Sequence, residues 1–420
     1  MRAELVAFTC AAVLFASLPA GAEPPRAPLF FVADPKFGVE TTVRTGDSLT
    51  RVVYRSEELF PELGLDERHF LAKSIAVFVR GLELVFVQEP IAELSVLFSH
   101  EVGGHGARAR ELDLKPTFLF HLPGVYRFLF APDDPPGTRG FTNYLSPEVV
   151  EGDRALLGTL GGLEANSVHT WWINSRIVRA NGRVHRGDLL VYGASKLPYW
   201  DSFLSGSATA DTSDVRSYVT ALADRFNQWR PEDRRRIERR LSAAYLWHVF
   251  DPTLLYAVYG TFVAGLWQGR RTSEMPLPTV FGMTALLSPR FVLSPFGAEH
   301  MLDLFLARDG RMLDLYGRVG SSGLADHYGA GARVLGVRAG ERVTLGAELD
   351  VWRQPEILLG ERGVYERAQR VGVNAGVLLD VRLTGILGIT GKLAAKTPGF
   401  VVGQPIGGGV HGYAGVSLAW

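Results

Sequence analysis

The sequence predicts an α+β chain of two parts. A mainly helical N-terminal domain, residues 23–275, precedes an antiparallel β-barrel of about eight strands, residues 276–420. Two observations carry this prediction. Up to about Arg271, apolar and charged residues recur at the intervals of helices that are apolar on one face. From about Pro276 onward, apolar and polar residues alternate with a period of two, as they do in strands.

The first 22 residues have the pattern of a secretory signal peptide. Arg2 gives a positive start, an apolar run extends from Leu5 to Leu18, and Ala20-Gly21-Ala22 forms a small-residue cleavage site. Cleavage after Ala22 would remove Cys10, the only cysteine. In the mature chain, any metal ion would then have to be held by His, Asp or Glu.

The charge balance bears on possible partners. Lys and Arg together number 44, Asp and Glu also number 44, and the formal net charge is zero. Nucleic-acid-binding domains usually carry a basic surface. We therefore expect no nucleic-acid partner.

Helices are expected over several segments of the N-terminal domain. Pro90 should break the first pair of helices, and Ser146-Pro147-Glu148 has the residues of a helix start. The last segment is apolar nearly all round and could be a buried helix or one that lies in a membrane. Its length of sixteen residues and the preceding Asp251 favour the buried helix. The expected helical segments are 66–88, 91–113, 146–178, 213–229, 230–250 and 252–267.

Strands are expected throughout the C-terminal part. In residues 341–352, Val343, Leu345, Ala347 and Leu349 share one face, and polar residues occupy the other. Asp309-Gly310 is a strong hairpin signal between two alternating segments.

Three features of these strands indicate an outer-membrane barrel rather than a soluble β domain, which is the alternative. The strands are about ten residues long, short turns alternate with long loops, and the chain ends on a strand that closes with Trp420. A terminal strand of this kind resembles the assembly signal of bacterial outer-membrane barrels. We therefore expect the barrel to contact outer-membrane lipid and to use the barrel assembly machinery, with the helical domain in the periplasm of a Gram-negative bacterium.

The segment "SHEVGGHGAR", residues 99–108, contains a candidate metal site. The common zinc motif H-E-x-x-H places two histidines four positions apart on one face of a helix. Here His105 lies five positions after His100, which in a regular helix would turn the two side chains about 140° apart. A single wide turn with i→i+5 bonding would bring them together. Gly103 and Gly104 would allow such a turn, although close helix packing would explain them equally well.

Further residues could complete this site. Glu101 occupies the place of the glutamate that acts as general base, and not as ligand, in zinc peptidases. A catalytic zinc normally has three protein ligands. Glu164, a lone acid in a later apolar helix, is the expected third ligand, because a buried carboxylate is costly unless it is paired or bound to metal. Asn166 and His169 are candidates for supporting hydrogen bonds, and both could replace Glu164 as third ligand, as could Glu151.

The H-E-x-x-x-H form, followed by a later helix with a third glutamate, resembles the dipeptidyl peptidase III metallopeptidases. The resemblance covers only these two helices and implies a zincin-like helical domain. It implies that His100, His105 and Glu164 bind Zn²⁺ and that Glu101 is the general base. That family has a Glu-Glu-x-x-Ala-Glu helix where this chain has "LEANSVH", and its members are larger, soluble and without a barrel. The likeness therefore extends to metal binding and hydrolysis, and not to substrate or overall fold.

These observations together lead us to expect an exported zinc metallopeptidase anchored in the outer membrane, with a peptide or protein as substrate. Two further possibilities remain. The chain could be a non-catalytic barrel protein with a structural or ligand-binding helical domain, in which the two histidines are core residues. It could also be a metal hydrolase that acts on a non-peptide substrate of the cell envelope.

Overall fold

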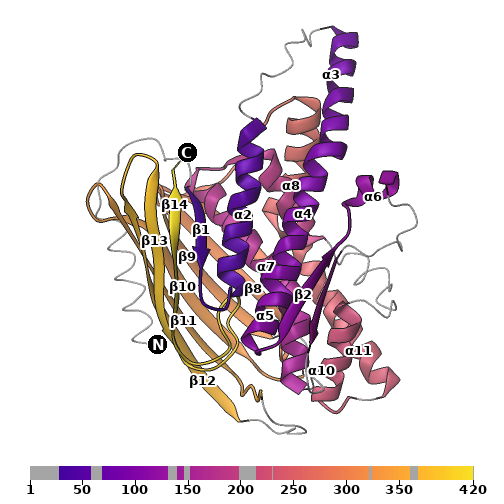
Figure 1. The fold of residues 1–420 in the computed structure, drawn as a ribbon, viewed down its shortest axis with the longest axis vertical. Helices are drawn as coiled ribbons and strands as arrows, with labels where there is room; N and C mark the ends of the chain where they lie inside the picture. The colour runs from indigo at the N-terminus through magenta and orange to yellow at the C-terminus, as the bar shows by residue number, and fades with distance from the viewer. Residues whose placement is uncertain are drawn as a thin grey trace.

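The computed structural model describes residues 28–57, 69–130, 140–145, 152–197, 214–228, 230–320, 324–359 and 368–419. The expected signal peptide and the Ser146-Pro147-Glu148 helix start lie outside these residues. Helices form one layer, and a curved antiparallel sheet lies along one side of them (Figure 1). The chain is therefore mixed α and β, with helices in the N-terminal part and a sheet in the C-terminal part, as expected.

The described helices are mostly long, and several of them adjoin a wide π-helical turn or a 3₁₀ turn, which carry η labels. They are α2 (Val39–Ser56), α3 (Phe70–Glu83), η2 (Leu84–Gln88), α4 (Glu89–His100), η3 (Glu101–His105), α5 (Gly106–Glu111), α6 (Gly124–Phe130), α7 (Gly152–Arg179), α8 (Arg186–Lys196), α10 (Asp214–Arg225), α11 (Pro231–Tyr245), η5 (Leu246–Phe250), α12 (Pro252–Val258) and η6 (Tyr259–Trp267).

The main sheet has ten antiparallel strands in the order β1-β14-β13-β12-β11-β10-β9-β8-β7-β6. The strands are β1 (Leu29–Ala33), β6 (Thr279–Val280), β7 (Met283–Ser294), β8 (Gly297–Arg308), β9 (Arg311–Gly320), β10 (Tyr328–Arg338), β11 (Val343–Pro355), β12 (Gln369–Arg382), β13 (Leu387–Lys396) and β14 (Gly409–Leu418). Two short hairpins stand apart, β2 (Lys115–Phe120) with β3 (Gly140–Leu145), and β4 (Arg183–His185) with β5 (Thr272–Glu274).

Eight consecutive long strands, β7 to β14, follow one another as neighbours in the sheet. Asp309 and Gly310 have left-handed φ values of 53° and 76° in the turn between β8 and β9, as the hairpin signal predicts. In the described residues, however, the sheet does not close into the expected barrel, because β1 and β6 form two separate edges. Helices occupy the inner side of the sheet, whereas a closed barrel of eight strands has room only for its own side chains.

The predicted boundary between residues 275 and 276 does not separate two independent bodies. Strand β1 comes from the N-terminal part and pairs with β14, with Leu29 opposite Leu418. Helix α7 is buried along most of its length and packs against α2, α4, α8, α10, η3 and β7. One continuous apolar core therefore includes side chains from both the helices and the sheet.

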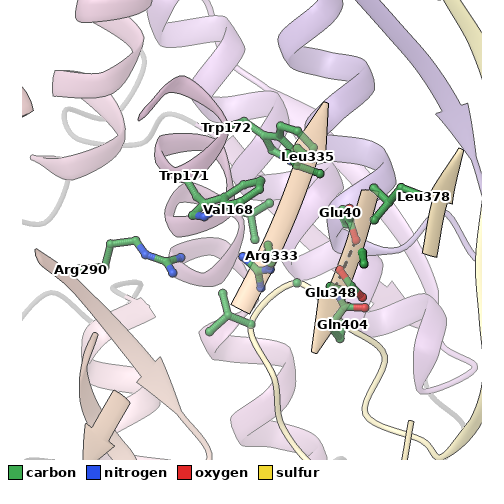
Figure 2. Close-up of a pocket in the computed structure, with 13 residues that line it drawn as sticks. Glu40, Val168, Trp171, Trp172, Arg290, Arg333, Leu335, Glu348, Leu378 and Gln404 are labelled. Carbon is green, nitrogen blue, oxygen red and sulfur yellow. Dashed lines mark hydrogen bonds between the residues drawn. The ribbon is translucent and has the colours of Figure 1, made fainter. Parts of the chain in front are cut away.

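The two faces of the long strands differ sharply in polarity. On β11, Leu345, Leu349 and Val351 are exposed on the outer face, whereas Glu348 and Asp350 are buried on the inner face. A small pocket between the sheet and α7 lies on that inner side, and Figure 2 shows acidic and basic side chains in it beside Trp171 and Trp172. This arrangement is the reverse of an antiparallel sheet that faces water, where the apolar side points inward.

The buried charges of the inner face are paired with one another. The Lys392 ammonium lies 2.7 Å from a carboxylate oxygen of Glu40 and 2.7 Å from one of Glu348. Arg290 forms two hydrogen bonds with Asp303, at 2.5 and 2.6 Å. Pairing is the condition under which charged groups can be buried at an acceptable free-energy cost.

Two expectations about the helices were wrong. Pro90 does not break the helix. The wide turn η2 ends at Gln88, and Pro90 lies in the first turn of α4, where proline's missing N–H group is tolerated. The segment 252–267 is not fully buried, since Leu255, Phe262 and Trp267 are exposed on its outer face. No single described helix is long and apolar enough to cross a membrane; 231–250 and 252–267 pass this test only together, with a 69° bend between them.

Candidate metal centre

Two histidines converge on one side of the helix that α4, η3 and α5 form. His100 is the last residue of α4, and His105 is the last residue of the wide turn η3. In a regular α-helix these side chains would point about 140° apart. The π-helical turn removes that separation, and their two Nε2 atoms lie 3.1 Å apart. The predicted distortion of this turn is confirmed.

Asp214, the first residue of α10, is the third group at this point. Its Oδ2 lies 3.1 Å from Nε2 of His100 and 3.3 Å from Nε2 of His105, so the three atoms form a nearly equilateral triangle. A tetrahedral zinc ion with bonds of about 2.0–2.1 Å separates its ligands by about 3.3–3.4 Å. The triangle thus has nearly the dimensions of one face of that tetrahedron. The Asp214 side chain is 32% exposed, which leaves solvent access on its side of the group.

Glycines bring α7 directly against the turn that carries the histidines. A Cβ on Gly104 would collide with the backbone of Gly161, and a Cβ on Gly162 would overlap the imidazole ring of His100. The sequence left a distorted turn and close helix packing as two possible reasons for the glycine pair. Both apply, because the turn is wide and α7 packs on it backbone to backbone.

The outer nitrogens of both imidazoles face groups on α7. Nδ1 of His105 donates to the carbonyl oxygen of Gly158 at 2.7 Å. Nδ1 of His100 faces the side-chain amide of Asn166 at 3.5 Å. Because Nδ1 of His105 donates to a carbonyl oxygen, Nε2 of His105 is the nitrogen that remains for a metal ion. Asn166 therefore lies where the sequence suggested a supporting residue.

The three groups are electrically complementary. Burial lowers the pKa of His105, but the nearby carboxylates of Asp214 and Glu101 outweigh that effect and raise it to about 9. Burial raises the pKa of Asp214, but His105 and His100 outweigh it and hold this pKa well below its usual value. Without a metal ion, the group is therefore held together as a histidine–carboxylate ion pair. Neutral imidazoles and a carboxylate are also the ligands that zinc takes in proteins.

Glu101 follows His100 directly and is buried at the start of the wide turn. The hydroxyl of Thr142, on β3, donates to Oε2 of Glu101 at 2.6 Å. The backbone of Gly140, on the same strand, packs so closely that a Cβ there would press on Cγ of Glu101. The β2–β3 hairpin therefore fixes the Glu101 carboxylate through one oxygen. The other oxygen can still accept a hydrogen bond or a proton.

Glu164 does not belong to this group. Both of its carboxylate oxygens accept hydrogen bonds from the guanidinium of Arg108, and the backbone N–H of Gly403 donates to Oε1 at 2.7 Å. The structure thus brings Asp214, and not the predicted Glu164, together with the two histidines. A buried carboxylate can be compensated by a cation as well as by a metal ion, and the sequence does not reveal that Arg108 faces Glu164.

His169 and Glu151, which the sequence also suggested as third ligand, do not join the group. His169 is buried between Ser99 and Asp47, at 3.2 Å from each, and Arg176 also binds Asp47. Glu151 is outside the described residues. Asp214 itself gave no distinctive signal, because an aspartate at the start of a helix is also a common helix cap.

Replacing Glu164 by alanine is expected to destabilise the fold while leaving the metal group intact. Arg108 and Glu164 are both almost completely buried, and the change would leave the guanidinium with Glu111 and the carbonyl oxygen of Gln404 in place of its two-bond contact to Glu164. Removing one partner of a buried ion pair costs about 3–5 kcal/mol. Denaturant unfolding should show that loss, and the folded fraction should bind as much zinc as the unchanged chain. A folded variant that had lost its zinc would restore Glu164 as a ligand.

Comparisons with known proteins identify no relative. No family model, no curated protein and no solved structure matches the chain.

Proposed function

We propose that this protein is a zinc-dependent hydrolase that cleaves peptide bonds. The observation that carries the proposal is the triangle of His100, His105 and Asp214, with edges of 3.1–3.3 Å. The buried carboxylate of Glu101 belongs to the residue after His100, and its charge helps to raise the pKa of His105. Two imidazole nitrogens and one carboxylate oxygen form the donor set of several catalytic zinc sites, which keep a fourth position for water or substrate.

The roles of the chain's own residues follow from this arrangement. His100, His105 and Asp214 would hold the ion, which when bound polarises the scissile carbonyl and lowers the pKa of its water. Glu101 would take one proton from the water as its oxygen attacks the carbonyl carbon. Glu101 would then give a proton to the leaving nitrogen as the C–N bond breaks. The Thr142 hydroxyl keeps this carboxylate in place.

The first test is metal content. The purified chain is expected to retain about one zinc ion, and the double variant His100→Ala, His105→Ala to retain none. His69→Ala, a change at an exposed histidine at the start of α3, serves as the matched control. A wild-type chain that takes up no zinc would contradict the proposal and support the view that the histidines are core residues.

The second test is activity on a mixed peptide library, with and without a chelator. Cleavage that stops on chelation and returns with zinc would support a metallopeptidase. A zinc-loaded chain that cleaves no peptide would contradict the peptidase proposal and favour a metal hydrolase of another envelope substrate.

We further propose that the chain is exported and held in the outer membrane by the outer face of β7–β14, with the barrel assembly machinery acting on β14. The support is the inverted polarity of the sheet: exposed aliphatic side chains outside and paired charges inside. Strands of 10 to 14 residues are also long enough to cross a bilayer. The helices on the inner side share one apolar core with the sheet, so they would lie beside its strands.

This proposal predicts the effect of arginine at the centre of β11. Leu349→Arg should reduce the amount of protein assembled in the outer membrane, because arginine at mid-membrane costs about 2–4 kcal/mol. Leu383→Arg, in the turn after β12, is the control, since this leucine is also exposed but lies outside the strands. Membrane fractionation measures both variants. Equal amounts of the two in the membrane, or recovery of the intact wild type as a soluble protein without detergent, would contradict the proposed location.

A further inference from the structure

On the outer face of the helical layer, as on the sheet, apolar side chains point outward and charged side chains point inward. The charged side chains of α3 turn toward η6: the ammonium of Lys73 lies 5.3 Å from the ring centroid of Trp267, and Arg80 donates to the carbonyl oxygen of Leu266 at 3.4 Å. Large apolar side chains on α3 and η2 point outward instead. Among those exposed are Phe70, Leu71, Ile75, Phe78, Val85 and Phe86.

This apolar face continues onto a second group of exposed side chains, on β2, α6 and the residues between them. We call this group the apolar lip: Leu119, Phe120, Leu122, Phe128, Leu129 and Phe130. Phe128 and Phe130 are 79% and 73% exposed.

The apolar lip is fixed to the helices by specific contacts. The N–H of Gly124 donates to Oε2 of Glu93 at 2.9 Å, and the hydroxyl of Tyr126 donates to the carbonyl oxygen of Phe86. These two bonds hold α6 against α4 and η2. The lip is therefore built into the fold with its apolar side chains turned outward.

The apolar lip leads to the candidate catalytic base. Phe120 pairs with Gly140 across the β2–β3 hairpin, and the backbone of Gly140 packs on Glu101. Two residues further along the same strand, Thr142 binds the Glu101 carboxylate. Exposed apolar surface thus begins on the outer face of α3 and η2 and ends beside the carboxylate that would move the proton.

We propose that the substrate is an amide bond adjacent to a hydrocarbon segment that lies in a lipid bilayer. This inference rests on the proposed function, because it assigns a substrate class to the same metal site. Exposed contiguous apolar surface is unfavourable in water and marks a contact with a partner or a membrane. Lipid is the occupant that fits, because charged side chains turn inward on α3 just as they do on the sheet. The hydrocarbon segment could be an acyl chain or an apolar peptide helix, and both present the same chemistry to the lip.

The experiment compares peptides that share one cleavable sequence. One peptide carries no anchor, one carries a palmitoyl chain, and one continues into an apolar helix; all are presented to zinc-loaded protein in phosphatidylethanolamine–phosphatidylglycerol vesicles. The wild type is expected to cleave at least one anchored peptide with a kcat/KM at least about tenfold above that of the unanchored peptide. The anchored peptide that is preferred identifies the source of the hydrocarbon.

A paired variant links this preference to the apolar lip. In the double variant Phe128→Ser, Phe130→Ser, the ratio of kcat/KM between anchored and unanchored peptides should fall toward one. Phe281→Ser, a change at an exposed phenylalanine in the turn between β6 and β7, should keep the wild-type ratio. Equal rates on all three peptides, or an unchanged ratio in the lip variant, would overturn the inference while leaving a zinc peptidase. Absence of cleavage of every peptide would instead count against the proposed function itself.

Discussion

Glu101→Gln is expected to keep its zinc ion and its fold but to lose about 10²–10⁴-fold in kcat. The glutamine side-chain amide has nearly the shape of the glutamate carboxylate, and its oxygen can still accept the hydrogen bond from Thr142. The packing of this side chain against Gly140 should therefore persist. It cannot take a proton from water. Steady-state hydrolysis and zinc content, measured on the same preparation, test this directly.

The matched control for this change is Glu89→Gln. Glu89 lies at the start of α4 on the same continuous helix and is exposed, so its loss of charge should leave kcat close to that of the wild type. The kcat of Thr142→Val should lie between those of Glu101→Gln and Glu89→Gln, because this change removes the hydrogen bond that holds the Glu101 carboxylate but leaves its basicity. A fully active Glu101→Gln protein would refute the role of Glu101 as base, even with zinc bound.

Asp214→Ala is expected to weaken zinc binding by more than about 100-fold, because groups that only support zinc ligands already contribute about 10–100-fold. The change removes one corner of the triangle and leaves two imidazoles, which is one ligand fewer than catalytic zinc sites use. Competition with a chromogenic chelator measures the affinity. Asp224→Ala, at an exposed position near the other end of α10, is the control and should bind zinc normally.

The comparison between Asp214→Ala and Glu164→Ala separates the two acids. The first should lose zinc with a smaller loss of stability than the second, because Asp214 is partly exposed and the imidazoles it leaves can become neutral. The second should lose stability and keep zinc, because its carboxylate binds Arg108 and the Gly403 amide. The opposite pattern would identify Glu164, and not Asp214, as the third ligand.

Local patterns in the sequence predicted the convergence of the two histidines well. The five-residue spacing and the glycines at 103 and 104 together indicate a wide turn, and η3 is such a turn. The alternation along β11 likewise predicted which side chains share a face. These features depend on residues close together in the chain, so a single sequence contains the information.

Features that depend on distant residues were not predictable in the same way. Whether Glu164 faces a metal ion or Arg108 is decided by how α7 packs on α5, which no short segment encodes. Asp214 joins the histidines from more than 100 positions away, and its own segment has only the appearance of a helix start. The edge strand β1 is short, and its partner β14 lies at the other end of the chain.

The pairing of β1 with β14 sets the order in which this protein can be completed. Among the described strands β1 pairs with β14 alone, and β14 follows it by more than 370 residues, so β1 can pair only after β14 has been synthesised. The loop that leads into β14 also supplies the amides of Gly403 and Ile406 to Glu164 on α7 and to Glu111 on α5, which continues the helix that carries His100 and His105. Contacts this distant in sequence form slowly. The helix that carries His100 and His105 therefore gains its last supports only when β14 is in place, so whatever the site does, it should begin to do so only after β14 has been added to the sheet.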